Sequence, residues 1–584
     1  MAPAILIENG IFFDGKRAPG VPRHVLVQDG QIARISEAPI QPPPDTRVID
    51  ARDQWVLPGF IDLHTHYDAE LEAIPSLHES LRHGVTTVFI GSCSLSTAVG
   101  DATDIADMFT RVEGIPYAHL LPLMQSRKTW TTHAEYAAHL DRLPLGPNVA
   151  SFVGYSAVRA KVMGLERALD AQAVPTEAEL AELERTLEEG FDAGFLGLSL
   201  NGLYWDKMGG DRFRSKCLPS TYASWKELRR MIRTVRRRRL NLQAIPNIST
   251  RYQLLFYLAF STGLFRDALK TSLVSIMDIR SNRQIWRALR GLGWLVNKVF
   301  RGQFRYQLLP VPFDLWADGF ENVVFEEFGA GAAALHLETP AQRRELFRDP
   351  AYRRRFRRQW ANPFLPKVFH RNFGMATVMR CPDRSLEGKS VREIARARGT
   401  SEVDTFLDLL IDHGNDLRWF TVTGNDRPGP LGALLSSPSN LIGFSDAGAH
   451  LRNMAFYNFP LRMLRFIRDA AARGTPVMPI EHAIHKLTGE IGAWFQIDAG
   501  TLEEGRRADL AVVDPRHLDA TLDEMHEEPI PELGGYVRLV RRNPQTVPAV
   551  IVNGTLVALA GEVLPEIGKT TGTGRFLRAR ASAP

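Results

Sequence analysis

Short apolar runs and amphipathic stretches alternate along the middle of the chain, from about residue 57 to residue 490. In the amphipathic stretches apolar residues recur every three or four positions, so the pattern predicts strands that alternate with helices. The predicted strands are 86–91, 149–154, 194–199, 241–245, 273–277 and 440–445, and the clearest helices are 177–190 and 224–239. Such repeated units are typical of a parallel α/β fold, and a TIM-like (β/α)8 barrel fits them best.

Both ends of the chain carry a different, β-rich pattern. Their apolar runs lie at 5–13, 25–33, 508–514 and 548–555. The first two runs contain Asn9-Gly10 and Asp29-Gly30, which are strong hairpin signals. We therefore expect both ends to pair into one small β-sandwich domain.

These patterns divide the chain into a β-sandwich made of 1–56 and 491–584 and a barrel made of 57–490. Within the barrel, the segment from about 285 to 375 is rich in Trp, Phe and Arg and does not follow the strand-helix rhythm. We expect this segment to be an insertion or lid near the mouth of the barrel.

Composition narrows the class of protein. Hydrophobic residues make up 44% and charged residues 23% of the 584 residues, which is ordinary for a globular chain. The three cysteines are widely spaced, so they cannot form a disulfide framework and suit a reducing compartment. No basic segment precedes the first apolar residues, and the near-apolar stretch 254–265 is shorter than the ~20 residues that cross a bilayer. We expect a cytoplasmic protein without stable membrane association.

The chain is mildly basic, with a net charge of +5 and a pI near 9.0. Arginines cluster at 229–239 and 343–358, in segments that look helical and have acidic or apolar residues between the arginines. A nucleic-acid or membrane patch is one interpretation, and solvated helix faces are the other. We favour the second and expect no nucleic-acid partner, while a basic surface would also suit an anionic substrate.

His64 and His66 stand at the end of the apolar run 56–63, which is predicted to be a buried strand that follows the turn Pro58-Gly59. Positions i and i+2 of a strand face the same side, so both imidazoles can reach one point. Zinc accepts neutral imidazole nitrogens at ~2.0–2.1 Å. The alternative is that two polar residues simply end a strand.

Two further strand ends carry residues that suit a metal site. Cys93 follows the strand 86–91, and as a thiolate it could be a third ligand. Asp446 follows the strand 440–445, and His450 comes four residues later. In a barrel of this type functional residues gather at the carboxyl ends of the strands. Each residue also has a structural explanation, because Cys93 could be a small buried hydrophobe and Asp446 could cap a helix.

At this point the motifs resemble those of the amidohydrolase superfamily, and within it the N-acyl-D-amino-acid deacylase (D-aminoacylase) branch. The similarity is spread over most of the chain. The matching stretches are 58–68 (PGFIDLHTHYD), 83–94 (HGVTTVFIGSCS), 444–450 (FSDAGAH), 487–489 (LTG) and 498–515 (DAGTLEEGRRADLAVVDP). The last stretch resembles the passage by which these enzymes leave the barrel and return to the small β domain.

The resemblance implies a TIM-like barrel with a β-sandwich and a Zn²⁺-dependent hydrolysis of amides. His64 and His66 would be metal ligands, and Cys93 would be the thiolate ligand that distinguishes the branch. Asp446 would bind or face the metal and act as general base, taking a proton from metal-activated water and passing it to the departing amine.

The sequence departs from the branch on two later strands, where the branch has histidine ligands. The corresponding stretches, 218–224 and 242–247, contain no histidine, and Gln243 and Asn247 are poor zinc ligands. Lys161 is a poor match for the carboxylated lysine used elsewhere in the superfamily. We expect one zinc per chain, held by the four residues above; a second metal, and a site that has lost its metal, stay open.

The expected substrate is a small linear amide that bears a carboxylate. His450 and Arg452 follow Asp446 on a loop that would overlook the mouth of the barrel, and arginine binds carboxylates with two parallel hydrogen bonds. Two alternatives are a cyclic-amide hydrolase of the hydantoinase or dihydroorotase type and a non-catalytic scaffold on the same fold. The acyl group, the amine, the chirality and a homo-oligomeric state stay open.

Overall fold

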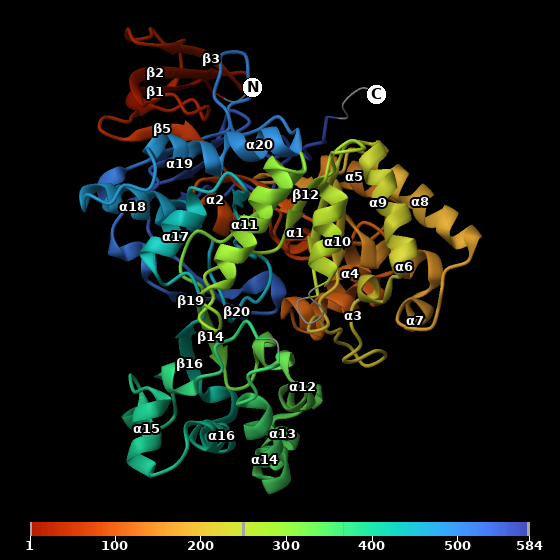
Figure 1. Ribbon diagram of the computed structural model, residues 1–584. Helices are drawn as coiled ribbons and strands as arrows, with labels where there is room; N and C mark the ends of the chain where they lie inside the picture. Colours follow the sequence, from red (N-terminus) through yellow and green to blue (C-terminus); the bar gives the residue numbers. More distant parts are fainter. Residues whose placement is uncertain (1–2, 248–251, 366, 581–584) are drawn as a thin grey trace.

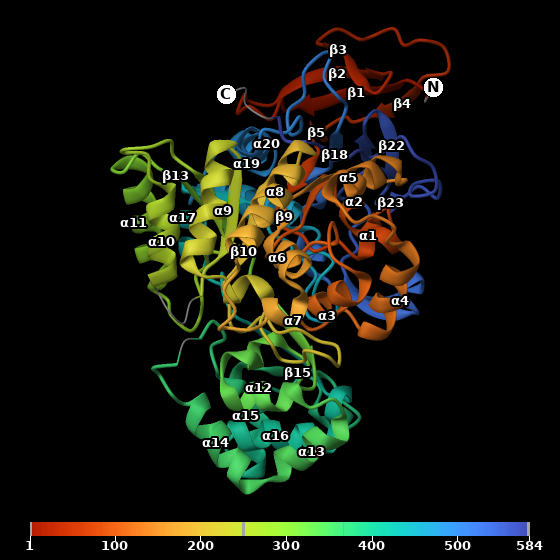
Figure 2. The ribbon, with the colours of Figure 1, turned by 90° about the vertical axis from the view of Figure 1, so that its right-hand side faces the viewer.

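The computed structural model describes residues 3–247, 252–365 and 367–580. The ends of the predicted first and last domains, 1–2 and 581–584, therefore lie outside the described residues. Three parts follow one another in space in Figures 1 and 2: a β-rich part near both chain ends, a central α/β part, and a helical lobe at the opposite end.

One sheet contains strands from both ends of the chain. Strand β5 (Trp55–Pro58) pairs on one side with β1 (Ile5–Phe12) and on the other with β18 (Leu510–Val513), which continues to β21 (Ala549–Val552). The ends therefore share one sheet, as the β-rich pattern indicates.

The two hairpin signals behave differently. Asp29-Gly30 is the two-residue turn between β2 (Val21–Gln28) and β3 (Gln31–Ser36). The hairpin expected at Asn9-Gly10 is wrong, because β1 runs through both residues as a β-bulge with Asn9 at φ 61°. Asn and Gly tolerate positive φ equally well in a bulge and in a turn, so the dipeptide alone does not distinguish them.

The central part holds buried parallel strands in two arcs. The first arc is β6-β7-β8, and the second is β9-β10-β11-β12-β13-β17. Their bounds are β6 (Phe60–Asp62), β7 (Val85–Ile90), β8 (Asn148–Ser151), β9 (Val153–Gly154), β10 (Gly197–Asn201), β11 (Asn241–Ile245), β12 (Lys270–Leu273), β13 (Gln303–Leu308) and β17 (Asn440–Ile442). Only Phe152 separates β8 from β9. At the other margin, the Asp446 N–H donates to the His64 carbonyl at 3.2 Å.

The strand expected at 56–63 is two strands in different sheets. β5 belongs to the terminal sheet and β6 to the first parallel arc, and Gly59 lies between them. A Cβ at Gly59 would lie 2.1 Å from the Thr86 hydroxyl oxygen, so only glycine fits this close approach. At Gly59 the chain therefore passes directly from the terminal sheet into the first parallel arc.

Helices cover the parallel strands as the periodicity indicates. The helix expected at 177–190 is α8 (Glu177–Asp192), and the one expected at 224–239 is α9 (Trp225–Arg237). α8 begins where it does because the Thr176 hydroxyl accepts from the Glu179 N–H while the Glu179 carboxylate accepts from the Thr176 N–H.

The helical lobe does not coincide with the segment 285–375. β13 is a strand of the second parallel arc, and helix α11 (Ile285–Lys298) directly precedes it. The lobe instead runs from β14 (Asp314–Asp318) to β16 (Arg418–Val422). β14, β16 and β15 (Thr377–Arg380) form an antiparallel sheet. The lobe helices are α12 (Gly329–His336), α13 (Pro340–Arg348), α14 (Pro350–Trp360), α15 (Val391–Arg398) and α16 (Glu402–His413). They enclose an aromatic core of their own, in which Phe373 stacks on Phe406 with ring centroids 3.8 Å apart.

Candidate metal centre and adjoining cavity

His64 and His66 converge on Asp446. β6 ends at Asp62, and both imidazoles follow it fully buried or nearly so. The Asp446 Oδ1 atom lies 3.6 Å from Nε2 of His64 and 3.3 Å from Nε2 of His66. The two histidines and the aspartate therefore face one point at the carboxyl ends of the first and last parallel strands.

Cys93 brings a sulfur to the same point. It follows β7 in a left-handed backbone conformation, φ 53°, and its Sγ lies 3.2 Å from Nε2 of His64. The side-chain oxygen of Gln243, on β11, accepts a hydrogen bond from the Cys93 N–H at 3.0 Å. Ligand atoms of His64, His66 and Cys93 all lie within 4.8 Å of one another.

The second nitrogen of each imidazole also has a polar neighbour. Nδ1 of His64 lies 2.5 Å from the side-chain oxygen of Gln307, on β13, and Nδ1 of His66 lies 3.2 Å from Oε1 of Glu113. Glu113 is the last residue of α3 (Ala102–Glu113) and is buried. The Gln307 oxygen at Nδ1 of His64 leaves Nε2 of that ring with a lone pair directed toward Cys93 and Asp446. Burial disfavours the charged form of His66, but Glu113, Cys93 and Asp446 outweigh it and raise the pKa of His66 well above its usual value, so this ring must lose a proton before it can bind a metal.

Electrostatics sets the protonation of this cluster. Burial lowers the pKa of His64 to about 4, so its imidazole is neutral at pH 7. Burial raises the pKa of the Cys93 thiol to about 12. Burial also opposes ionisation of Asp446, but the hydrogen bond and charge of His66, together with His64, outweigh it and hold the pKa of Asp446 below its usual value. Asp446 is therefore a carboxylate.

The four side chains fit a zinc ion. Two imidazole nitrogens, one sulfur and one carboxylate oxygen are donors that zinc uses, and donors around a tetrahedral zinc with bonds of about 2.0–2.3 Å lie about 3.3–3.8 Å apart. Three pairs of donors, His64 with Cys93, His64 with Asp446 and His66 with Asp446, lie 3.2, 3.6 and 3.3 Å apart, which agrees with that spacing. Lys161, the poor match for a carboxylated lysine, lies exposed on α6 (Tyr155–Met163) and donates to the Thr131 carbonyl.

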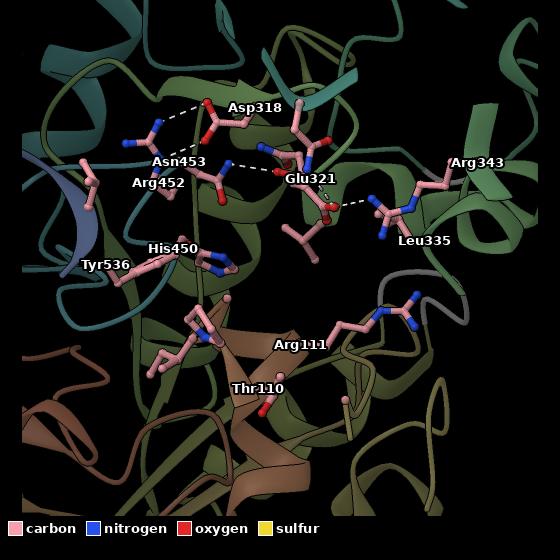
Figure 3. A pocket seen from close by; sticks show the side chains of 18 of the residues that line it. Thr110, Arg111, Asp318, Glu321, Leu335, Arg343, His450, Arg452, Asn453 and Tyr536 are labelled. Atoms are coloured by element: carbon pink, nitrogen blue, oxygen red, sulfur yellow. Dashed lines mark hydrogen bonds and ion pairs between the residues drawn. The ribbon is translucent and has the colours of Figure 1, made fainter. Parts of the chain in front are cut away.

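A cavity of about 1470 Å³ lies between the central part and the lobe, and none of the four side chains above lines it. Figure 3 shows His450 at its wall, opposite Arg111 and Arg343, with Tyr536 beside it. The His450 N–H donates to the Glu113 carbonyl at 2.6 Å, which joins the cavity wall to the residue that contacts His66. Burial lowers the pKa of His450, so it presents a neutral imidazole to the cavity.

Arg452 lines the same cavity, but its guanidinium already has partners. Nε and Nη2 bind Asp318 of β14 at 2.7 and 3.1 Å, and Nη1 lies 3.3 Å from Glu527 of β19 (His526–Ile530). Glu527 also lies 2.8 Å from Arg418 of β16. Ion pairs therefore connect the loop after β17, the lobe and β19. A substrate carboxylate would have to displace one of these partners of Arg452.

The sequence analysis missed Glu113 and Gln307. A carboxylate in the last turn of a helix opposes the helix dipole, and Glu113 directly precedes the C-capping glycine, Gly114. That unfavourable position is a local signal for a special role. Gln307 lies in a stretch that we expected to be part of the insertion, so no pattern pointed to it.

Comparisons with known proteins agree with this fold. An uncharacterized protein of Mycobacterium tuberculosis is 46% identical over 98% of this chain and 95% of its own length. N-acyl-D-aspartate deacylase of Alcaligenes xylosoxydans xylosoxydans is 31% identical over 35% of this chain and 38% of its own length. The crystal structure of N-acyl-D-glutamate deacylase from Bordetella bronchiseptica, in complex with zinc and a phosphonate inhibitor, matches 98% of this chain and 99% of its own with a TM-score of 0.62 at 21% identity. No family model matches the chain.

The chain belongs to one family with the uncharacterized protein of Mycobacterium tuberculosis. It is similar to the D-aminoacylase-like amidohydrolases in about a third of its sequence and in its fold.

Proposed function

We propose that this chain is a metal-dependent hydrolase of linear amides, an N-acyl-amino-acid deacylase, whose metal is one zinc held by His64, His66, Cys93 and Asp446. The convergence of His64, His66 and Cys93, with Asp446 at 3.3 to 3.6 Å from the two imidazoles, carries the proposal. N-acyl-D-aspartate deacylase, as a partial relative, supports an N-acyl-D-amino acid as substrate.

The proposal includes a closed (β/α)8 barrel made of the two parallel arcs, in which β8 and β9, separated by Phe152 alone, count as one strand. Support comes from backbone hydrogen bonds between the segments that follow the first and last strands. The Asp446 N–H donates to the His64 carbonyl, and the His66 N–H donates to the Ala447 carbonyl at 2.7 Å. A closed barrel would fix Asp446 against both histidines.

A zinc ion in this site would supply a nucleophile at neutral pH and polarise the scissile carbonyl. The chain itself handles the proton: the ionised Oδ of Asp446 accepts it from the attacking water and donates it to the nitrogen of the departing amine. Gln307 and Glu113 hold the two imidazoles in one orientation. His450 faces the cavity and is the proposed contact for the substrate.

Release of free amine from N-acetyl-D-amino acids and their L-isomers, by zinc-loaded protein, tests this function. In Asp446→Asn we expect kcat to fall by about 10²–10⁴-fold, because the amide cannot take the proton. Asp412→Asn, on the exposed side of α16, is the matched control and keeps full activity. Activity of Asp446→Asn within a few-fold of wild type would show that another group handles the proton. No turnover of any N-acyl amino acid by the zinc-loaded protein would favour the scaffold alternative.

A further inference from the structure

One face of the central part exposes apolar side chains that the proposed reaction does not use. It lies on α10 (Tyr252–Ser261), on α11 and on the loops that follow them, which form the left-hand edge of the molecule in Figure 2. The exposed apolar residues are Leu255, Phe256, Leu264, Phe265, Trp294, Val299 and Phe300. Phe265 is 98% exposed, so it packs on nothing within this chain. A contiguous apolar patch on a folded chain marks an interaction site.

Basic residues border these apolar side chains. The exposed cations are Arg229, Arg233, Arg266, Arg290, Lys298 and Arg301, and together with the apolar residues above we call them the basic aromatic face. A shallow groove is lined by Arg229, Arg233 and Arg266 together with Phe256. The loop after α10 reaches the end of α11, where the Gly263 N–H donates to the Phe300 carbonyl at 3.0 Å.

The arginines of α9 show that this positive charge is not neutralised by the chain. On one side of the helix Arg230, Arg237 and the C-capping Arg238 bind carboxylates of α8 at 3.4 Å or less. On the side toward α10, Arg229 and Arg233 have no carboxylate partner among the described residues. The same holds, within the described part of the chain, for Arg266, Arg290, Lys298 and Arg301.

Acidic residues are nearly absent from this region of the sequence. Between residues 252 and 302 the chain has two, Asp267 and Asp278. Asp278 is buried in ion pairs with Arg283 and Arg427, and Asp267 lies 3.6 Å from Arg239. The basic aromatic face therefore presents net positive charge around exposed aromatic and aliphatic groups.

The positive charge and the apolar side chains of this face together indicate which kind of partner it can bind. A second copy of the chain in a two-fold contact would place these cations against themselves, which is repulsive. Nucleic acid would satisfy the cations, but its backbone offers no apolar environment for Leu264, Phe265 or Val299. An anionic bilayer suits both the cations and the apolar side chains, because its headgroups attract Lys and Arg while its interface accepts Phe, Trp and Leu.

We propose that the basic aromatic face docks this protein reversibly onto anionic lipid bilayers. Along the described chain no helix is both long enough and apolar enough to cross a bilayer. The proposal departs from the sequence analysis, which favours solvated helix faces over a membrane patch at 229–239 and expects no stable membrane association. It does not depend on the proposed enzymatic activity.

Co-sedimentation of the full chain with vesicles tests the proposal. We expect binding to vesicles of phosphatidylcholine with phosphatidylglycerol at low salt, and weak binding to phosphatidylcholine alone. Phe265→Ser removes one fully exposed ring, which we expect to weaken partitioning about 10-fold or more. Phe364→Ser, at a ring that is 92% exposed in the lobe, is the matched control and binds like wild type.

Two triple variants with equal net charge test the electrostatic part. Arg229→Gln/Arg233→Gln/Arg266→Gln removes cations of the face, and we expect partitioning to fall on the order of 100-fold. Arg230→Gln/Arg237→Gln/Arg238→Gln removes the arginines that pair with carboxylates of α8, and this variant should bind nearly as wild type.

Three results would overturn the proposal. One is equal binding to neutral and anionic vesicles, or no binding to either. Another is equal loss in the two triple variants or in the two Phe variants, with circular dichroism confirming that each is folded. The third is a dimer that Phe265→Ser dissociates, or a complex with duplex DNA that excludes vesicles, because either would assign the face to a different partner.

Discussion

Removing the charge of Glu113 should weaken the binding of zinc without touching a zinc ligand. Glu113 Oε1 lies 3.2 Å from Nδ1 of His66, and its side chain is 2% exposed, so solvent screens the interaction little. Burial raises the pKa of Glu113 to about 8, so the comparison is made above that pH, where the carboxyl group is ionised. In Glu113→Gln an amide oxygen remains beside Nδ1 of His66, but the charge is lost. In the metal-bound protein a hydrogen bond from Nδ1–H of His66 would contribute about 1.5–3 kcal/mol with a carboxylate as acceptor and about 0.5–1.5 kcal/mol with an amide oxygen. The difference of about 1–1.5 kcal/mol corresponds to about 10-fold in the Kd for zinc.

Glu113→Ala removes the acceptor altogether, and for it we expect a Kd up to about 100-fold above wild type. The assay is competition for zinc between the protein and a chromophoric chelator at fixed pH, which reads metal affinity and not turnover. Glu227→Gln is the matched control, because Glu227 is equally buried but binds Arg159 away from the histidines. If both Glu113 variants bind zinc within twofold of wild type, the carboxylate does not orient His66.

Two more predictions concern protons and the cavity. Because burial raises the pKa of the Cys93 thiol to about 12, the thiol is protonated before metal binds and must release its proton to become a ligand. Release of this proton should make the apparent Kd for zinc fall about 10-fold per pH unit between about pH 6 and 8. In Cys93→Ser the slope of log Kd against pH should be smaller by one unit. An unchanged slope would exclude Cys93 as a thiolate ligand. For Arg452, whose N–H groups already bind Asp318 and Glu527, we expect Arg452→Met to raise KM equally for N-acyl amino acids and for amides without a carboxylate. A selective rise for the carboxylate substrates would instead show that Arg452 binds them, as the sequence analysis expects.

Features with a short-range cause were predicted well. The alternation of apolar runs with amphipathic stretches indicated the helices α8 and α9 and the parallel strands, except that β12 lies at Lys270–Leu273 and not at 273–277. Burial sets that periodicity locally. β13 was missed because its sequence, Gln303 to Leu308, carries polar residues at 303, 305 and 307, one of which is Gln307 at the metal site. A strand whose side chains serve a site does not show the apolar pattern of a core strand.

Features that depend on distant segments were not predictable. Gly59 separates two strands because Thr86 lies against it. The guanidinium of Arg452 binds a carboxylate because the lobe brings Asp318, 134 residues away in the chain, next to it. The motif positions placed His64, His66, Cys93 and Asp446 at strand ends, and the structure brings these four side chains together. Their role as metal ligands stays a prediction.

Zinc content of the purified protein tests the central claim most directly. Elemental analysis of protein prepared without chelator should give about one zinc per chain, in wild type and in the surface control Asp412→Asn. In His64→Ala/His66→Ala we expect the zinc to be lost, because both nitrogen donors are removed while Cys93 and Asp446 remain. A wild-type protein without zinc that also fails to bind added zinc, or a double variant with undiminished zinc, would contradict the metal centre proposed for this chain.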